Sequence, residues 1–235
     1  MREERSASAC PEPEKSAPEK PAGPELPAAP PGSLNGWVLR TLQGYPLNGA
    51  CGYHWPAPGS DPWEGTTVSL VYDGVQLTHG DPQRRSYCCG LTFEVYVRAL
   101  LAANGGAPVP GLAASELHEL RLRFFGDSKT KERRRLVQAG IESLGLGRRV
   151  ELEDARAGDF VQFWRHRGSG HSAIFINWAR RKGAIVGLTY WSSQSSTDGI
   201  GYHTEPVGPE GIDAKEIYLA RADWPLAAAR RAQKR

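Results

Sequence analysis

The stretch that most constrains the fold of this chain is residues 86–101, where two adjacent cysteines stand between a turn-rich loop and a helical pattern. Glycine and proline in residues 78–82 argue against regular structure before the cysteines. After them, apolar residues recur at helical spacing and predict a buried helix over residues 88–103. The first N–H groups and the positive end of a helix stabilise a thiolate, the reactive form of cysteine. This placement favours a nucleophile, and the alternative is that both cysteines are small core residues.

The composition fits an ordinary soluble globular protein. With 40% hydrophobic and 23% charged residues, the 235-residue chain can bury a core, and no apolar run is long enough for a membrane span. The formal charge of +3 is too weak to indicate nucleic acid as a partner. Because the four cysteines lack paired metal-ligand spacing, we expect neither a metal nor another cofactor. Cys51 could form a disulfide with Cys88 or Cys89, and the sequence leaves that pairing open.

Residues 1–33 consist mainly of Pro, Ala, Glu, Ser and Lys. Such a segment cannot offset its ordering entropy by burial, so it is predicted to be a disordered tether. Within it, Ala7-Ser8-Ala9-Cys10 has the form of the end of a bacterial lipoprotein signal, but residues 1–5 are charged where an apolar stretch is expected. Either the start lies upstream and a lipid on Cys10 holds the protein at the cell envelope, or Cys10 is incidental and the domain is cytoplasmic.

One folded domain is predicted over residues 34–226, followed by a basic tail at 227–235. Helices that precede an antiparallel sheet indicate an α+β fold, and we expect a monomer. The predicted elements are helices near 35–44, 88–103, from 115 onward and 131–144, a hairpin within 66–78 that turns at 73–74, and strands at 160–164, 171–178, 184–194 and 217–220.

A cysteine nucleophile needs a base, and the base needs an orienting partner. His171 begins a predicted strand directly after a flexible Gly-Ser-Gly turn, which is an edge position rather than a core one. If the following hairpin turns at residues 181–182, His171 lies opposite about Ser192, and Gln194 is on the same face one step along. Gln194, with its longer amide side chain, is the better candidate to hold the imidazole.

Three segments resemble the catalytic motifs of NlpC-type cysteine peptidases. Cys88-Cys89-Gly90-Leu91 is similar to the Cys-Ser-Gly-Leu opening of the family's catalytic helix. Residues 158–164 resemble its Gly-Asp strand, and residues 171–176 resemble its His strand, in the same order. The resemblance covers about residues 84–195. It implies a papain-like fold, in which a helical part bearing the cysteine packs on an antiparallel sheet bearing the histidine.

The resemblance also implies a function and a set of roles. Cys88 would be the nucleophile and His171 the base, and the third polar residue would lie on the next strand, which here contains no His. Members of the family mostly hydrolyse peptide or amide bonds in bacterial peptidoglycan. Two alternatives stay open: a non-catalytic glycan- or peptide-binding module with packed cysteines, or an acyltransferase or transpeptidase that uses the same dyad.

The chain departs from the family pattern around the substrate. Tyr87 stands where an Asp usually precedes the cysteine, and two extra helices are inserted between residues 115 and 144. Aromatic side chains form walls for sugars or peptides, although tryptophan is also common buried mass. The predicted substrate-contacting residues are Tyr87, Trp55, Trp164, Trp191 and Ser192.

Overall fold

The computed structural model describes residues 29–56, 63–125 and 133–226. The helices are α1 (Asn35–Gln43), α2 (Cys88–Ala103), α3 (Ala114–Phe124) and α4 (Leu136–Ser143). A hairpin comprises β1 (Leu70–Tyr72) and β2 (Val75–Thr78), and the remaining strands are β3 (Gly147–Val150), β4 (Phe160–Arg165), β5 (Gly170–Arg181), β6 (Ala184–Gln194), β7 (Gly199–Pro206) and β8 (Ile212–Ala222).

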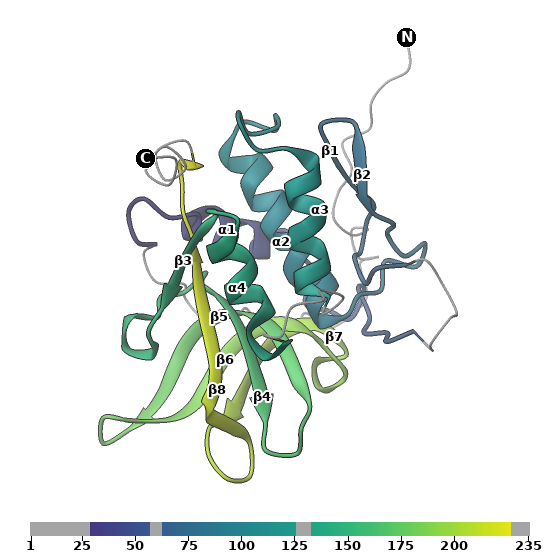
Figure 1. Ribbon diagram of the computed structural model, residues 1–235. Coiled ribbons are helices and arrows are strands. Elements are labelled where there is room, and N and C mark those ends of the chain that lie inside the picture. The colour runs from purple at the N-terminus through teal and green to yellow at the C-terminus, as the bar shows by residue number, and fades with distance from the viewer. Residues whose placement is uncertain (1–28, 57–62, 126–132, 227–235) are drawn as a thin grey trace.

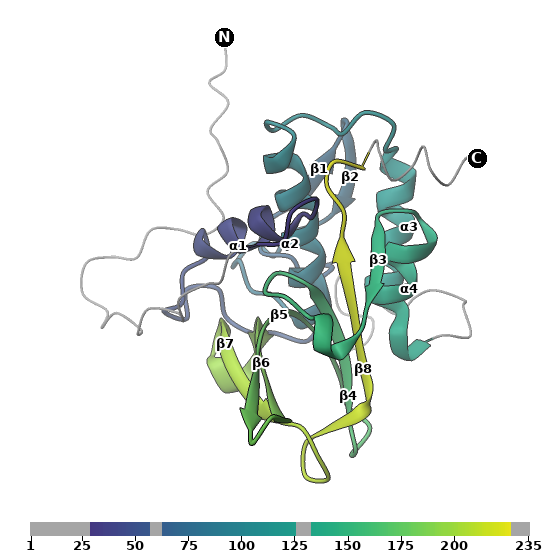
Figure 2. The ribbon, with the colours of Figure 1, turned by 90° about the vertical axis from the view of Figure 1, so that its left-hand side faces the viewer.

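The last six strands form one antiparallel sheet in the order β3-β8-β4-β5-β6-β7. In both Figure 1 and Figure 2 the helices gather on one side of this sheet. The predicted α+β class is therefore confirmed. The hairpin turns at Asp73-Gly74 as predicted, because both residues adopt the positive φ that a tight two-residue turn requires.

The central helix α2 has the predicted bounds and is held by its surroundings at its first turns. A Cβ atom on Gly90 would lie 2.3 Å from the Glu64 carbonyl oxygen, so only glycine lets the loop approach this closely. The fully buried Glu94 carboxylate accepts hydrogen bonds from the Tyr45 hydroxyl and from the backbone and side chain of Thr67. The start of α2 is thereby fixed against two loops that precede it.

Both faces of the large sheet are buried, which explains the nearly continuous apolar runs of its central strands. Ile174 and Trp191 pack towards the helices, whereas Phe163 and Tyr190 belong to the apolar cluster on the opposite face. His171 contacts the rings of Phe163 and Tyr190, so the candidate base lies on that second face, at the start of β5.

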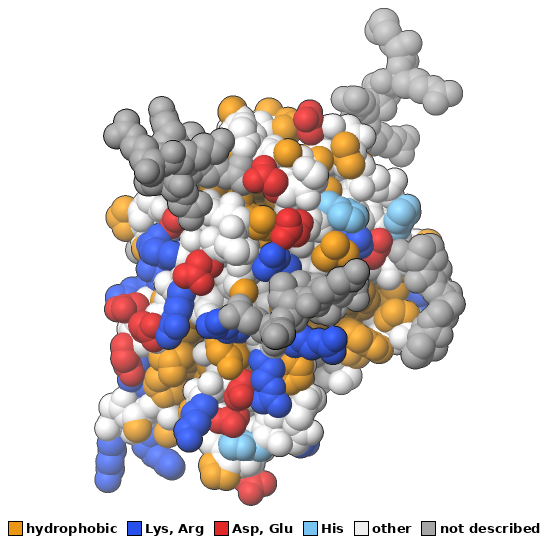
Figure 3. Space-filling model, in the orientation of Figure 1, with side chains coloured by type: hydrophobic (Ala, Val, Ile, Leu, Met, Phe, Trp, Pro, Cys, Tyr) orange, Lys and Arg blue, Asp and Glu red, His pale blue; other side chains and the backbone are white. Residues whose placement is uncertain are grey.

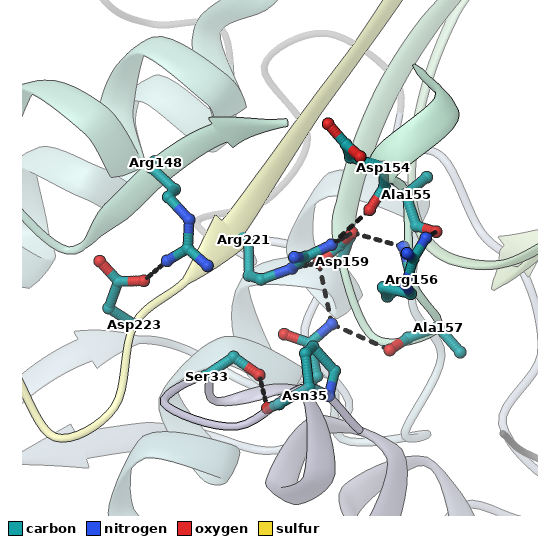
Figure 4. A network of polar contacts seen from close by, with 11 residues as sticks. Ser33, Asn35, Arg148, Asp154, Ala155, Arg156, Ala157, Asp159, Arg221 and Asp223 are labelled. Carbon is teal, nitrogen blue, oxygen red and sulfur yellow. Dashed lines mark hydrogen bonds and ion pairs between the residues drawn. The ribbon is translucent and has the colours of Figure 1, made fainter. Parts of the chain in front are cut away.

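The Gly-Asp pair at the start of β4 has a structural role, shown in Figure 4. Asp159 is fully buried and accepts hydrogen bonds from the Asn35 side chain, from the Arg156 backbone N–H and from two nitrogens of Arg221. Gly158 has a φ of +91°, and a Cβ atom there would lie 2.9 Å from Asn35 Cβ. The network joins α1, β4 and β8.

The predicted pairing of β5 with β6 is wrong by two residues. The structure pairs Ile174 with Trp191, and continuing this register brings Gln194, not Ser192, level with His171. The cause is the turn, which lies at residues 182–183, where both residues have positive φ, rather than at 181–182. A turn displaced by one position moves every partner by two.

Three further elements differ from the prediction. The helix predicted over residues 131–144 begins only at Leu136, after a short 3-10 turn at Arg133–Arg135. Strands β3 and β7 were not predicted. They are the two edges of the sheet, and edge strands often lack a clear apolar pattern because charged residues and proline are tolerated there.

The ends of the chain and Cys10 lie outside the described residues, so the tether, the basic tail and the lipid on Cys10 stay predictions. The folded part begins slightly earlier than residue 34, because Ser33 bridges to Asp223. Cys51 forms a disulfide while Cys88 and Cys89 are free, so the suggested pairing of Cys51 with either of them is wrong.

None of the described helices is both long and apolar enough to cross a bilayer. On the face drawn in Figure 3, acidic and basic side chains are interspersed rather than gathered by sign.

Candidate active site

The start of α2 meets the start of β5 and brings the two predicted catalytic residues together. Tyr87 caps α2 in an extended conformation, with φ −133° and ψ 167°, and Cys88 is the first helical residue. His171 is the second residue of β5. The imidazole of His171 hydrogen-bonds the thiol of Cys88, and both side chains line the same two clefts. Cys88 therefore has the polar neighbour that a merely packed cysteine lacks.

The two adjacent thiols differ in acidity. A hydrogen bond from the Cys89 thiol is the largest influence on Cys88, and it lowers the pKa; burial opposes it, and the charge and hydrogen bond of His171 and a backbone hydrogen bond from Ser172 lower it further. The net result is a Cys88 pKa well below the ordinary thiol value. Donation to Cys88, burial and the charge of Cys88 raise the pKa of Cys89 well above that value. Cys88 is the better nucleophile, because the thiolate is the reactive form.

The imidazole of His171 packs mainly against aromatic rings. The residue is 9% exposed, and its ring centroid lies 5.5 Å from that of Phe163 and 5.3 Å from that of Tyr190. Among the described residues, no hydrogen-bond partner reaches its buried Nε2 atom. Contacts with aromatic rings, rather than a described hydrogen bond, therefore surround this nitrogen.

Gln194, the predicted orienting residue, makes its described hydrogen bonds to other groups. It is the last residue of β6 and lines the larger cleft. Its Oε1 atom accepts from the Tyr190 hydroxyl at 2.8 Å, and its Nε2 atom donates to the Ser196 hydroxyl at 2.8 Å. Neither bond is to His171, and the orienting role of Gln194 stays a prediction.

Two clefts meet at the thiol. The larger has a volume of about 610 Å³ and the smaller about 340 Å³. Four residues line both: Trp55, Cys88, Gly170 and His171. Cys88 and His171 therefore lie on the boundary between the two clefts, and a molecule that extends into both would present its middle to the sulfur.

Of the predicted substrate-contacting residues, Trp55 and Trp164 lie in the clefts. Trp55 is 60% exposed and borders both, while the half-buried Trp164 borders the smaller one. The Trp55 ring rests on Tyr87 with a centroid distance of 4.7 Å. Trp55 thus has a free face towards the thiol.

The other three predicted contacts are structural instead. Trp191 is 1% exposed and packs on Tyr45, because its position on β6 directs it towards the helices. The buried Ser192 hydroxyl donates to the Ser172 carbonyl at 2.8 Å. Tyr87 is buried in an aromatic cluster, and the described lining of neither cleft includes it.

Tyr53, Arg165 and Glu205 are site residues that the sequence did not reveal. Tyr53 lines the larger cleft together with Cys88, and its pKa is raised by burial and by the charges of Cys88 and Cys89. Glu205 of β7 forms a two-pronged ion pair with Arg165 of β4, with Nη2 to Oε2 at 2.7 Å. Tyr53 lies in an irregular loop and Glu205 on an unpredicted strand, so no periodicity marked either one.

Among the described residues, no group of three or more His, Cys, Asp or Glu side chains is arranged to bind a metal ion. Comparison of the chain with protein-family models, curated proteins and solved structures found no match. The function of this chain is therefore inferred from the geometry of its site.

Proposed function

We propose that this protein is a cysteine-dependent hydrolase of a peptide or amide bond, with Cys88 as the nucleophile and His171 as the base. The observation that carries the proposal is an acidified thiol, hydrogen-bonded to an imidazole, at the meeting point of two clefts. A lowered thiol pKa beside a base is what nucleophilic catalysis by cysteine requires.

In the proposed reaction, the Cys88 thiolate attacks the carbonyl carbon of the scissile amide and forms a tetrahedral intermediate. The first N–H groups of α2 and the Tyr53 hydroxyl are the candidate donors to the oxyanion. The protonated His171 gives its proton to the leaving amine as the C–N bond breaks, which leaves a thioester. Neutral His171 then takes a proton from water as the water oxygen attacks the thioester, and the acid leaves with the thiolate restored.

The papain-like fold and the peptidoglycan substrate are proposed from the resemblance to the NlpC-type motifs. A cysteine-bearing helix packed on a histidine-bearing antiparallel sheet supports a papain-like arrangement. Peptidoglycan peptides are the proposed substrate, which implies action in the cell envelope.

Thiol labelling tests the assignment of the nucleophile. Wild type and Cys89→Ser should be alkylated at position 88 by iodoacetamide, whereas Cys88→Ala should lose rapid labelling and all activity while keeping its circular dichroism spectrum. Rapid labelling that persists in Cys88→Ala and disappears in a Cys89 variant would assign the role to Cys89 instead.

Incubation of the purified protein with muropeptides, with and without an added amine, tests the reaction. Free carboxylate and amine products support hydrolysis, and a new amide formed only with the added amine indicates acyl transfer. Retention of an intact muropeptide without turnover, despite a reactive Cys88, would overturn the hydrolase proposal in favour of a binding module.

A further inference from the structure

The two clefts that meet at the thiol differ in chemistry. Aromatic and aliphatic side chains form much of the described lining of the smaller cleft, namely Trp55, Phe124, Phe125, Leu136 and Trp164, and its one charged side chain other than the site itself is the exposed Arg133. The larger cleft instead carries charged and imidazole side chains, namely Arg165, Arg167, His203, Glu205 and Glu210. A substrate that lies across Cys88 thus meets an apolar surface on one side and a charged surface on the other.

The apolar walls are already packed in place. The Phe125 ring meets Tyr87 edge-on at a centroid distance of 5.9 Å and Phe93 at 6.3 Å. The indole N–H of Trp164 donates to the Arg134 carbonyl at 2.9 Å, and a Cβ atom on Gly170 would lie 3.0 Å from the Trp164 ring. A ligand would therefore lose little by ordering these side chains.

Two polar groups of the smaller cleft are already hydrogen-bonded within the protein. The buried Gln162 accepts a hydrogen bond from the Val137 N–H, and the Ser172 carbonyl accepts one from Ser192. An apolar group could enter without breaking these bonds. The volume of about 340 Å³ is at the lower end of the ~300–1,000 Å³ typical of ligand pockets.

We propose that the smaller cleft is a specificity subsite that receives a bulky apolar side chain of the substrate, of leucine or phenylalanine type, next to the scissile amide. Such a subsite favours peptides with a side chain of this kind over the stem peptides of peptidoglycan, whose side chains are small or charged. The polar remainder of the substrate lies in the larger cleft. The subsite is built mainly by Phe124, Phe125 and Leu136 of the inserted helices and their ends, and by Trp164 and Trp55. This inference rests on the proposed function, because it assumes that Cys88 attacks the bound amide.

A series of dipeptide chloromethyl ketones tests the subsite separately from the chemistry. These probes alkylate the active thiol and differ only in one side chain, which is Ala, Leu or Phe, while iodoacetamide measures the reactivity of Cys88 without a side chain. We expect the Leu or Phe probe to react about 10- to 100-fold faster than the Ala probe. Trp164→Ala and Phe125→Ala should each remove most of that advantage and leave the iodoacetamide rate unchanged.

Trp37→Ala is the matched control, because Trp37 is a partly buried tryptophan of α1 that stacks under Arg40 and lines neither cleft in the described structure. It should keep the full preference. If Trp164→Ala fails to fold, Phe125→Ala measures the same loss of preference for the Leu or Phe probe. Equal rates for all three probes with normal iodoacetamide labelling would overturn the subsite alone. Loss of iodoacetamide labelling at Cys88 in the wild type would overturn the proposed function as well.

Discussion

At the residue scale, the acidity of Cys88 is the property on which the proposed chemistry depends. Its low pKa has two removable causes: the hydrogen bond from Cys89 and the charge and hydrogen bond of His171. Each cause favours the thiolate, so removing either one raises the pKa of Cys88. Cys89 and His171 thus both act by lowering the pKa of Cys88.

The pH dependence of alkylation measures this effect. Wild-type Cys88 should keep its iodoacetamide rate well below the ordinary thiol pKa of about 8.5. His171→Ala and Cys89→Ala should lose most of that rate near pH ~6 and recover it at alkaline pH, because the thiol pKa is higher in both. Cys89→Ser retains a donor and is the control for Cys89→Ala. Identical pH profiles in wild type and His171→Ala would contradict the coupling.

A second residue-scale prediction concerns Asp159, which resembles a catalytic motif residue but is bound entirely within the fold. Asp159→Ala leaves the buried Arg221 and Asn35 without their acceptor, and breaking one side of a buried ion pair costs about 3–5 kcal/mol. Urea denaturation should show a loss of that order. Glu153→Ala, which removes an exposed ion pair with Arg180, should cost less than about 1 kcal/mol. Similar midpoints for both variants would refute the assigned role.

At the element scale, α2 is constrained by contact as well as by helical propensity. Replacing a helical glycine with alanine ordinarily stabilises a helix by about 0.5–1 kcal/mol. At Gly90 the added methyl group would meet the Glu64 carbonyl oxygen at 2.3 Å, and this neighbour is backbone that cannot move aside cheaply. The close packing that positions Cys88 therefore reverses the usual preference.

The same Gly→Ala substitution in two helices should change the free energy of unfolding in opposite directions. Gly90→Ala is expected to lower the free energy of unfolding by about 1–3 kcal/mol, as overpacking does, and to slow alkylation of Cys88. Gly36→Ala in α1 places the methyl group 3.3 Å from the Ala29 Cβ atom, which is 1.0 Å farther than the contact at Gly90, and should be close to neutral or stabilising. Thermal denaturation of both variants decides the point. A stabilised Gly90→Ala would show that the loop is not pressed against the helix.

The elements that could be predicted from sequence are those whose local signal agrees with their packing. The bounds of α2 follow from its apolar spacing and the Asn104-Gly105 stop, and the β1–β2 turn follows from Asp73-Gly74. The β5–β6 register could not be predicted, because Lys182 adopts positive φ and no pattern announces it. Edge strand β7 could not be predicted because its sequence has no clear apolar period. Glu205 lies on that strand, so its place at the site could not be predicted either.

At the scale of the whole molecule, the candidate site is assembled from segments far apart in sequence. Cys88 and His171 were predictable because each begins an element with a strong local pattern. Tyr53, Arg165 and Glu205 reach the site only through the tertiary arrangement, so their roles follow from the structure alone. The described hydrogen-bond partners of Gln194, Tyr190 and Ser196, are likewise set by the tertiary arrangement.

The Arg165–Glu205 pair joins β4 to β7, strands that are not neighbours in the sheet, and gives the fold a pH dependence. Burial alone would raise the pKa of Glu205, but the hydrogen bonds and charge of Arg165 outweigh it, so the pKa lies below its ordinary value of 4.5. The ionised carboxylate therefore stabilises the fold fully above that value, and the contribution is lost as the pH falls through the lower folded pKa.

Glu205→Gln loses the charge that pairs with Arg165, so it should be less stable than wild type near neutral pH. Because glutamine does not titrate, the variant should lose less further stability than wild type on acidification between pH ~5 and ~2. Urea midpoints across this range measure both differences. Glu153→Gln is the matched control, since its exposed ion pair with Arg180 contributes little, and its curve should run close to that of wild type. If Glu205→Gln and wild type lost stability in parallel on acidification, the pair would not be the acid-sensitive link between these strands.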